Sequence, residues 1–160
     1  MKKFCYWKIT YSEIIKVDSV NSQQLYLRAK IWFVHSFVSA KNVIQLDDKE
    51  AGKLIGKGVF DVNTSILPKA KTNAGFVEFT VDIQVKDGRY KYTFTDFWHK
   101  SGGAGISTPG DLRLEKPGGG LVTMGMKNWE GIKQQTHVTV ISMVESLKKV
   151  MGAKKEPDEW

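Results

Sequence analysis

The sequence contains a single cysteine, Cys5, among its 160 residues. A lone cysteine excludes an intrachain disulfide, and it leaves no cysteine cluster that could hold zinc. Cys5 lies in an apolar stretch typical of a strand. We therefore interpret it as an inert buried thiol rather than a nucleophile, which would need a lowered pKa and a neighbouring base.

Long apolar runs are also missing. None approaches the roughly 18 residues that a membrane span requires. The first residues carry the positive charges of a signal peptide, but Lys8 and Thr10 interrupt the apolar stretch that should follow. As written, the chain is expected to be cytoplasmic, unless a leader was removed from a longer form.

Catalytic and cofactor motifs are absent as well. The sequence has no Gly-x-Ser-x-Gly elbow and no His-Glu-x-x-His pair, and residues 52–58 lack the spacing and the hydroxyl residue of a phosphate loop. The three histidines, His35, His99 and His137, are too far apart to predict a metal site. We predict no metal, no cofactor and no catalytic residue, although a triad assembled from distant positions would leave no motif.

The charge balance is basic, with a net charge of +7 and an isoelectric point of about 9.4. Such a surplus can indicate a nucleic-acid or anionic-surface partner. The sequence contains no long block of like charges, however. We therefore favour a solvated surface rich in lysine, and keep nucleic-acid binding as an alternative.

The strongest structural signal lies between Gly75 and Trp98. Apolar and polar residues alternate on both sides of Asp87-Gly88, a pair typical of a type I′ hairpin turn. A two-residue loop gives a register in which the apolar residues face one another, as Val85–Tyr90, Ile83–Tyr92 and Val81–Phe94. The pattern predicts a sheet with one buried face and one wet face of mixed charge. Asp96 would fall on the apolar side, so we expect a bulge or the end of pairing there.

Shorter patterns predict the remaining elements. Aromatic and β-branched runs favour strands, and apolar residues at spacings of three and four favour helices. The expected elements are strands at residues 4–17, Val43–Leu46 and Lys53–Val62, a helix over Ser22–Ala40 capped by Asn21 or Ser22, and a helix from Asn128 onward. Gly56 and Gly58 share one face of a strand, which indicates that another element comes close. We favour a packed helix over a ligand as that element.

A long glycine-rich loop is expected between the hairpin and the last helix, over residues 99–127. It is bracketed by Trp98, His99 and Trp129. Because aromatic side chains beside a loop can form a binding surface, these three are the candidate ligand-binding residues. Core packing of both tryptophans is the simpler alternative. Residues 1–153 are expected to form one domain, and 154–160 a flexible charged tail.

Four segments resemble a known bacterial family. They are Tyr11–Asp18 (YSEIIKVD), Leu25–Trp32 at the start of the first helix, Gly56-Lys57-Gly58, and Ile83–Tyr92 (IQVKDGRYKY). Together with the order of the elements, they resemble the DUF4468 family, described as having a TBP-like fold. The resemblance covers residues 9–98 and implies that fold. It implies no activity, since the family is of unknown function, and its members often begin with an export signal, which leaves localisation open.

These observations predict an α+β fold, with a curved antiparallel sheet of about five strands in the order β-α-β-β-β-β-α and two helices on one face. Our leading hypothesis is a non-catalytic domain that binds a small ligand or a protein through the open sheet face or the glycine-rich loop. The alternative is nucleic-acid binding by the basic surface, and a second alternative is an enzyme with its site near His99. Fold alone does not decide among them.

Overall fold

The computed structural model describes residues 9–37, 43–67, 70–100, 110–112 and 125–153. Its elements are β1 (Tyr11–Lys16), α1 (Ser22–Ser36), β2 (Ile44–Asp48), β3 (Lys53–Leu67), β4 (Ala70–Lys86), β5 (Arg89–Lys100), β6 (Gly110–Asp111) and α3 (Met126–Gly152). This order confirms the predicted α+β fold and adds the short strand β6. The predicted tail and most of the predicted glycine-rich loop lie outside the described residues.

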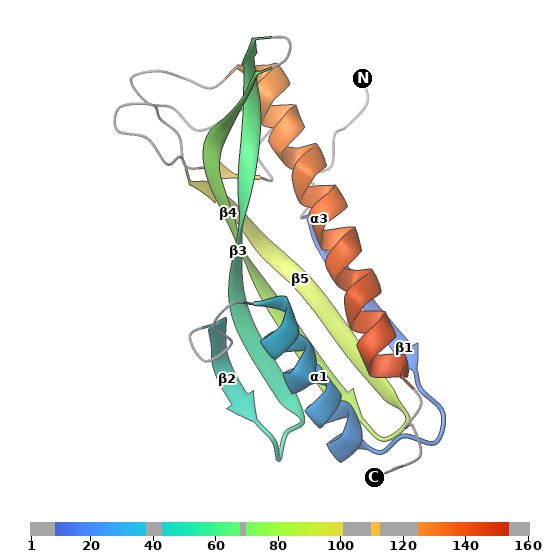
Figure 1. Cartoon of the computed structure of the whole chain (residues 1–160). Coiled ribbons are helices and arrows are strands. Elements are labelled where there is room, and N and C mark those ends of the chain that lie inside the picture. The colour runs from blue at the N-terminus through green and yellow to red at the C-terminus, as the bar shows by residue number, and fades with distance from the viewer. Residues whose placement is uncertain (1–8, 38–42, 68–69, 101–109, 113–124, 154–160) are drawn as a thin grey trace, which may run out of the picture.

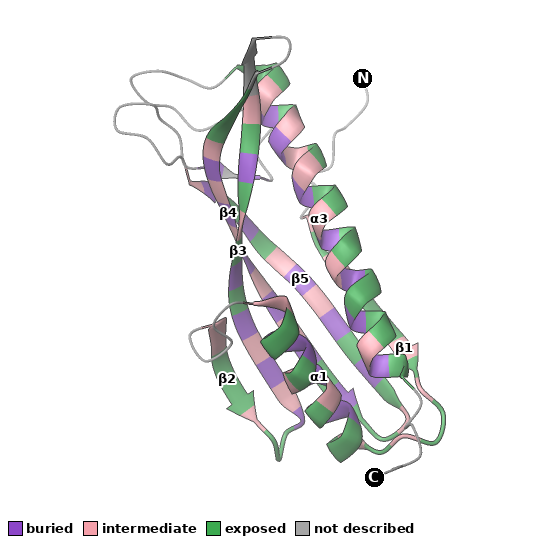
Figure 2. Cartoon of the chain, viewed as in Figure 1, coloured by how far each residue is buried: buried purple, intermediate pink, exposed green. Residues whose placement is uncertain are grey.

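The strands form one antiparallel sheet in the order β1-β5-β4-β3-β2, with β6 paired to the far end of β5. Both helices pack on the same face of this sheet, α1 over β3 and β4 at one end and α3 along its length (Figure 1). Buried residues lie on the sides of α1 and α3 that face the sheet, and no helix among the described residues covers the opposite face (Figure 2). The prediction of two helices on one face is therefore confirmed.

The β4–β5 hairpin has the predicted register. Val85 pairs with Tyr90, Ile83 with Tyr92 and Val81 with Phe94, and all six side chains are buried. The alternation of apolar and polar residues produces this arrangement, because a slip of one residue would expose the whole apolar set.

The register shifts at Asp96, where a bulge was expected. Pairing passes from Thr80–Thr95 to Glu78–Trp98, so β5 carries one extra residue there. Asp96 takes a positive φ of 57°, a left-handed conformation that aspartate tolerates better than most residues. The extra residue reverses the alternation beyond it, so that Trp98 points away from the helices and His99 points toward them.

The hairpin turn differs from the expected type I′ geometry. Type I′ requires a positive φ at both loop residues, whereas only Gly88 has one, of 71°. The Asp87 side chain instead accepts a hydrogen bond from the backbone N–H of Ser22 at 2.7 Å. The Gly88 N–H also donates to the carbonyl of Val20. The turn is thereby joined to the start of α1.

The start of α1 has the predicted cap, because the Asn21 side chain accepts from the N–H of Gln24 at 2.9 Å. Its buried face packs on the two strand glycines. A Cβ atom at Gly56 would lie 2.5 Å from the Phe33 ring, and one at Gly58 would lie 2.6 Å from the Phe37 ring. The glycines therefore make room for a helix, as expected.

The helix α3 begins at Met126 and runs for 27 residues. The β-branched run inside it remains helical because its buried positions recur at helical spacing, as Trp129, Ile132, Thr136, Val140, Val144, Leu147 and Met151. The side chain of Gln135 also holds the free edge of β3, accepting from the N–H of Asn63 at 2.9 Å and donating to its carbonyl at 2.7 Å. Neither this helix nor α1 is apolar enough over sufficient length to cross a membrane.

Candidate functional site

The structure separates the three residues that bracket the predicted loop. His99 and Trp129 are buried on the helix side of the sheet, with their rings edge to face at 6.1 Å. The His99 ring also contacts the backbone carbonyl of Ala74 at 2.7 Å. Trp98 points to the opposite face and is 43% exposed. Only Trp98 of the three is therefore placed where a partner could contact it directly.

Among the described residues, no helix covers the sheet face opposite α1 and α3, and we call this face the open sheet face. It consists of the outward side chains of the five long strands. Its exposed apolar members are Ile14, Leu46, Val59 and Trp98, which are 64%, 40%, 58% and 43% exposed. It runs for roughly 23 Å between Lys91 and Trp98 along β5, at about 3.3 Å per residue.

One end of the open sheet face, next to the hairpin turn, is cationic. Lys16 pairs with Arg89 across β1 and β5, and Arg89 pairs with Lys86 across β5 and β4. In the next row Ile14 pairs with Lys91, which pairs with Gln84. We call Lys16, Lys86, Arg89 and Lys91 the basic cluster.

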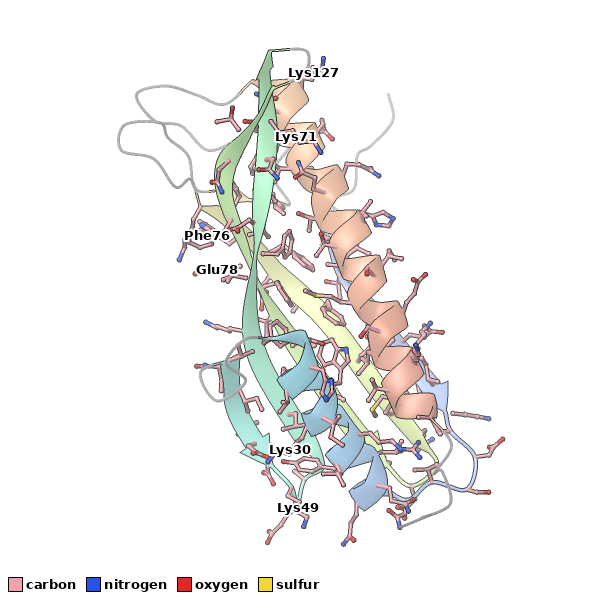
Figure 3. The ribbon with its side chains drawn as sticks, in the orientation of Figure 1. Lys30, Lys49, Lys71, Phe76, Glu78 and Lys127 are labelled. Atoms are coloured by element: carbon pink, nitrogen blue, oxygen red, sulfur yellow. The ribbon has the colours of Figure 1, made fainter. Side chains whose placement is uncertain are left out.

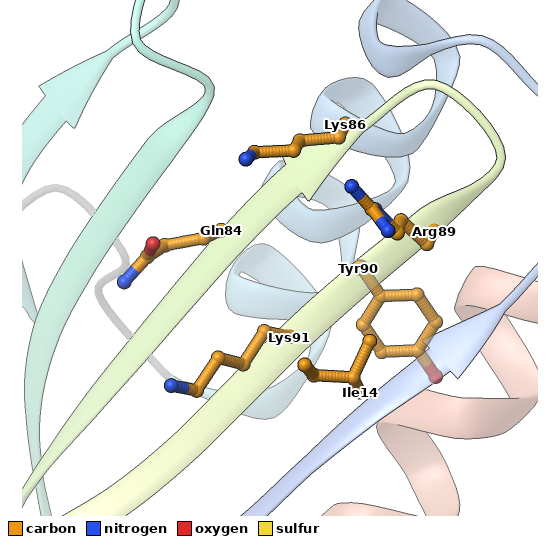
Figure 4. A pocket seen from close by; sticks show the side chains of 6 residues that line it. All are labelled: Ile14, Gln84, Lys86, Arg89, Tyr90 and Lys91. Carbon is orange, nitrogen blue, oxygen red and sulfur yellow. The ribbon is translucent and has the colours of Figure 1, made fainter.

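A shallow pocket of about 240 Å³ lies over three members of the basic cluster, Lys86, Arg89 and Lys91. It is lined by Ile14, Gln84, Lys86, Arg89, Tyr90 and Lys91. The close view shows the two lysines, the guanidinium and Ile14 standing on the same side of three neighbouring strands (Figure 4). The strand register therefore gathers apolar, amide and cationic groups around one concavity.

The acids of the open sheet face lie farther along the strands, and each has a basic partner. Lys53 pairs with Asp82 at 3.5 Å, and Lys100 pairs with Glu78 at 2.8 Å. Glu78 and Phe76 project from β4 on the side away from α3 (Figure 3). The sequence predicted a face of mixed charge, and these two ion pairs confirm it. The row formed by Lys16, Arg89 and Lys86 contains no acid, and the nearest acid along β4, Asp82, accepts from the Gln84 amide at 3.3 Å.

A family model described as a domain of unknown function with a TBP-like fold, DUF4468, matches residues 11–100. The chain belongs to the DUF4468 family. The matched residues run from β1 to the end of β5 and include the whole basic cluster and Trp98. A search of curated proteins found no match.

Two solved structures share the fold of this DUF4468 chain. A DUF4468 family protein from Bacteroides ovatus is 14% identical with a TM-score of 0.70, over 94% of this chain and 90% of its own. A TBP-like protein from Parabacteroides distasonis is 11% identical with a TM-score of 0.56, over 88% of this chain and 93% of its own. At these identities the likeness establishes the fold alone, and a specific function has to be argued from the residues.

The helix α3 lies beyond the residues matched to DUF4468, and a polar network ties it to the sheet edge. The Glu13 carboxylate accepts hydrogen bonds from Lys148 of α3 at 2.7 Å and from the Tyr92 hydroxyl at 2.9 Å. These two hydrogen bonds, with that of Lys148 the stronger, lower the pKa of Glu13 below its ordinary value of 4.5. Glu13 lies on the helix side, so it does not neutralise the basic cluster.

We predict that Glu13→Gln lowers the thermal midpoint at pH 7 by about 1–3 °C, because it removes an exposed ion pair. A carboxylate whose pKa is lowered by folding stabilises the protein above its unfolded pKa, and loses that effect as the pH falls through the folded pKa. The difference in thermal midpoint between the variant and the parent should therefore become smaller below pH 4.5. Thermal unfolding followed by circular dichroism from pH 7 to pH 2.5 measures it. Glu145→Gln, the same change on the exposed side of α3, is the control. If Glu13→Gln lowers the thermal midpoint by the same amount at pH 7 and at pH 2.5, the ion pair is not the cause of the loss.

Within the residues that the structure describes, no group of three histidine, cysteine or acidic side chains could hold a metal ion. The open sheet face combines three kinds of side chain. It offers cationic groups at one end, hydroxyl groups of Ser12, Thr93 and Thr95 in the middle, and the Trp98 indole at the other end.

Proposed function

We propose that this DUF4468 domain is a non-catalytic binding module whose ligand or protein partner docks on the open sheet face. The observation that carries the proposal is that this face, which no described helix covers, combines exposed apolar side chains with a pocket and a basic cluster. The outward positions of an ordinary solvated sheet face are mostly polar. The large exposed apolar side chains of Ile14, Val59 and Trp98 therefore distinguish this face from an ordinary one.

The rigidity of this face supports the proposal. Its central strands β4 and β5 are paired on both sides, and their inner side chains are packed into the core. A surface held in this way loses little conformational entropy on binding, which favours affinity. Aromatic residues are over-represented among the anchors of binding surfaces, which makes Trp98 the expected anchor at its end of the face.

A catalytic role receives no comparable support. His99, on which the enzyme hypothesis depended, is fully buried. Its ring lies between the backbone of Ala74 and the Trp129 ring. A substrate on the open sheet face would be separated from this imidazole by the sheet itself.

The proposal is tested by a fragment screen on the ¹⁵N-labelled full chain, with amide shifts mapped onto the structure. Binding fragments should perturb open-face amides such as those of Val59, Thr80 and Thr95, together with the Trp98 indole. Trp98→Ala should lower, by about tenfold, the affinity for those fragments that contact the indole. Leu27→Ala, which shortens an exposed apolar side chain on α1, is the matched control. Perturbations confined to the outer sides of α1 and α3 would sink the proposal.

A second candidate, nucleic-acid binding, is favoured by one observation, the four cations of the basic cluster. Binding to phosphates would be strongest at low salt and fall steeply as salt rises. The ion-paired acids Glu78 and Asp82 farther along the face do not extend a phosphate track. Electrophoretic retardation of single- and double-stranded oligonucleotides at low salt tests this candidate, and absence of any retardation removes it.

A further inference from the structure

The basic cluster contains an arrangement that folding alone does not favour. Lys16, Arg89 and Lys86 form one row across three adjacent strands, each directly opposite the next. Like charges in directly opposite positions of a sheet are destabilising. All three residues are exposed, so each could be replaced by a neutral polar residue without any loss to the core.

No acid among the described residues forms an ion pair with these three cations. The nearby carboxylates are engaged elsewhere: Asp87 by the Ser22 N–H, Asp82 by Lys53 and Gln84, and Glu13 by Lys148 and Tyr92 on the other face. In the part of the chain that the structure describes, none of the four cations makes an ion pair. The cluster therefore keeps its positive potential for a group from solution.

The pocket over the cluster offers more than charge. Arg89 and the lysines Lys86 and Lys91 can donate hydrogen bonds to oxygen atoms, and the Gln84 amide adds both a donor and an acceptor. Ile14, 64% exposed, supplies an apolar surface next to them. At about 240 Å³ the pocket is below the usual range for a drug-sized molecule.

The frame around the pocket holds these groups in place. Arg89 follows the turn directly, and the turn is fixed by the bonds from Asp87 to Ser22 and from Gly88 to Val20. The N–H of Val17, just after β1, donates to the carbonyl of Gly88. The three strands that carry the cluster thus meet at one hydrogen-bonded junction, so their side chains start from fixed backbone positions.

We infer that the basic cluster is the recognition site for a small organic anion with at least two negative charges on phosphate or carboxylate oxygens, whose apolar portion lies on Ile14. This inference rests on the proposed function and specifies the ligand chemistry at one end of the same face. Three cations that line one concavity, with Lys16 paired beside Arg89, match a multiply charged group better than a single carboxylate. The pocket size suits a compact anion rather than a long chain.

The test is a calorimetric titration of the full chain at low salt with two probes, pyrophosphate and citrate. These probes distinguish phosphate from carboxylate as the preferred oxygen group. Either probe should bind with saturation, and the amides of Ile14, Gln84 and Lys91 should shift in the ¹⁵N spectrum. Arg89→Gln combined with Lys91→Gln should weaken binding by about tenfold or more, because each removes charge-assisted hydrogen bonds.

The matched control is Lys71→Gln combined with Lys127→Gln. These two exposed lysines lie at the other end of the molecule, near the tip of the β3–β4 hairpin and the start of α3 (Figure 3). The change in net charge is the same, so a site at the cluster predicts an effect below about twofold for the control. Equal weakening in both pairs, or no binding of either probe, overturns the inference.

The outcomes also separate this inference from the broader proposal. If fragments bind near Trp98 while neither anion binds, the open sheet face remains a binding surface and the anion site is wrong. If an oligonucleotide binds at the cluster and both small anions fail, nucleic acid replaces the small anion. Because both positions are exposed, the double variant Arg89→Gln with Lys91→Gln should keep the thermal midpoint of the parent. A loss of anion binding in this variant is then not caused by unfolding.

Discussion

Replacing Gly58 with alanine should lower the free energy of unfolding by about 1–3 kcal/mol, as overpacking of a filled core does. The added Cβ atom would lie 2.5 Å from Cζ of Phe79 and 2.6 Å from Cε1 of Phe37. Both rings belong to the aromatic layer between α1 and the sheet, so neither can move without disturbing others. Urea unfolding followed by far-UV circular dichroism measures the loss.

Two further variants sharpen this test. Gly131→Ala, in the interior of α3, meets no atom within 4 Å of the new Cβ. It should raise stability by about 0.5–1 kcal/mol, because alanine favours the helix and narrows the unfolded ensemble. Phe79→Leu should offset part of the Gly58→Ala loss, by at least about 0.5 kcal/mol in a double-mutant cycle. Strict additivity would mean that the Phe79 ring is not what excludes the methyl group.

Much of this architecture was predictable because it depends on local pattern. The β4–β5 register follows from alternation on both sides of a short loop, and the two agree on one pairing. The bulge was expected because Asp96 would otherwise lie in the core. The effect of the bulge could also have been predicted from the sequence, since one extra residue in a strand moves each later side chain to the opposite face of the sheet. Applying that rule would have sent Trp98 outward and His99 inward, and would have separated the three candidate site residues.

The basic cluster was not predictable in the same way, since it depends on which strands become neighbours. Lys16 and Arg89 are 73 residues apart, and they meet only because β1 docks on β5 rather than on the strand that follows it in sequence. The pairing of Glu78 with Lys100 likewise depends on the shifted register beyond the bulge. Sequence alone therefore indicated a mixed face, whereas the fold decides which of its charges become neighbours.

Trp32→Ala is expected to cost about 3–5 kcal/mol, the range for a large buried aromatic side chain. The Trp32 side chain is fully buried on α1, and its ring contacts Phe33, Phe37 and Phe94 edge to face. Because Phe94 lies on β5, this contact fixes α1 to the strand that carries Lys91 and Arg89. Equilibrium urea unfolding should show the loss directly.

Trp32→Phe separates the two properties of the indole. Phenylalanine keeps most of the buried apolar ring but removes the Nε1–H, which is buried and has no hydrogen-bond partner among the described residues. A buried donor without a partner is itself destabilising. Its removal should therefore offset part of the free energy of unfolding that is lost because the phenylalanine ring is smaller. The phenylalanine variant should therefore lose less than half as much stability as the alanine variant. If the two variants lose the same amount, the indole N–H makes a stabilising hydrogen bond, and the packing of α1 on β5 depends on polarity as well as on ring contacts.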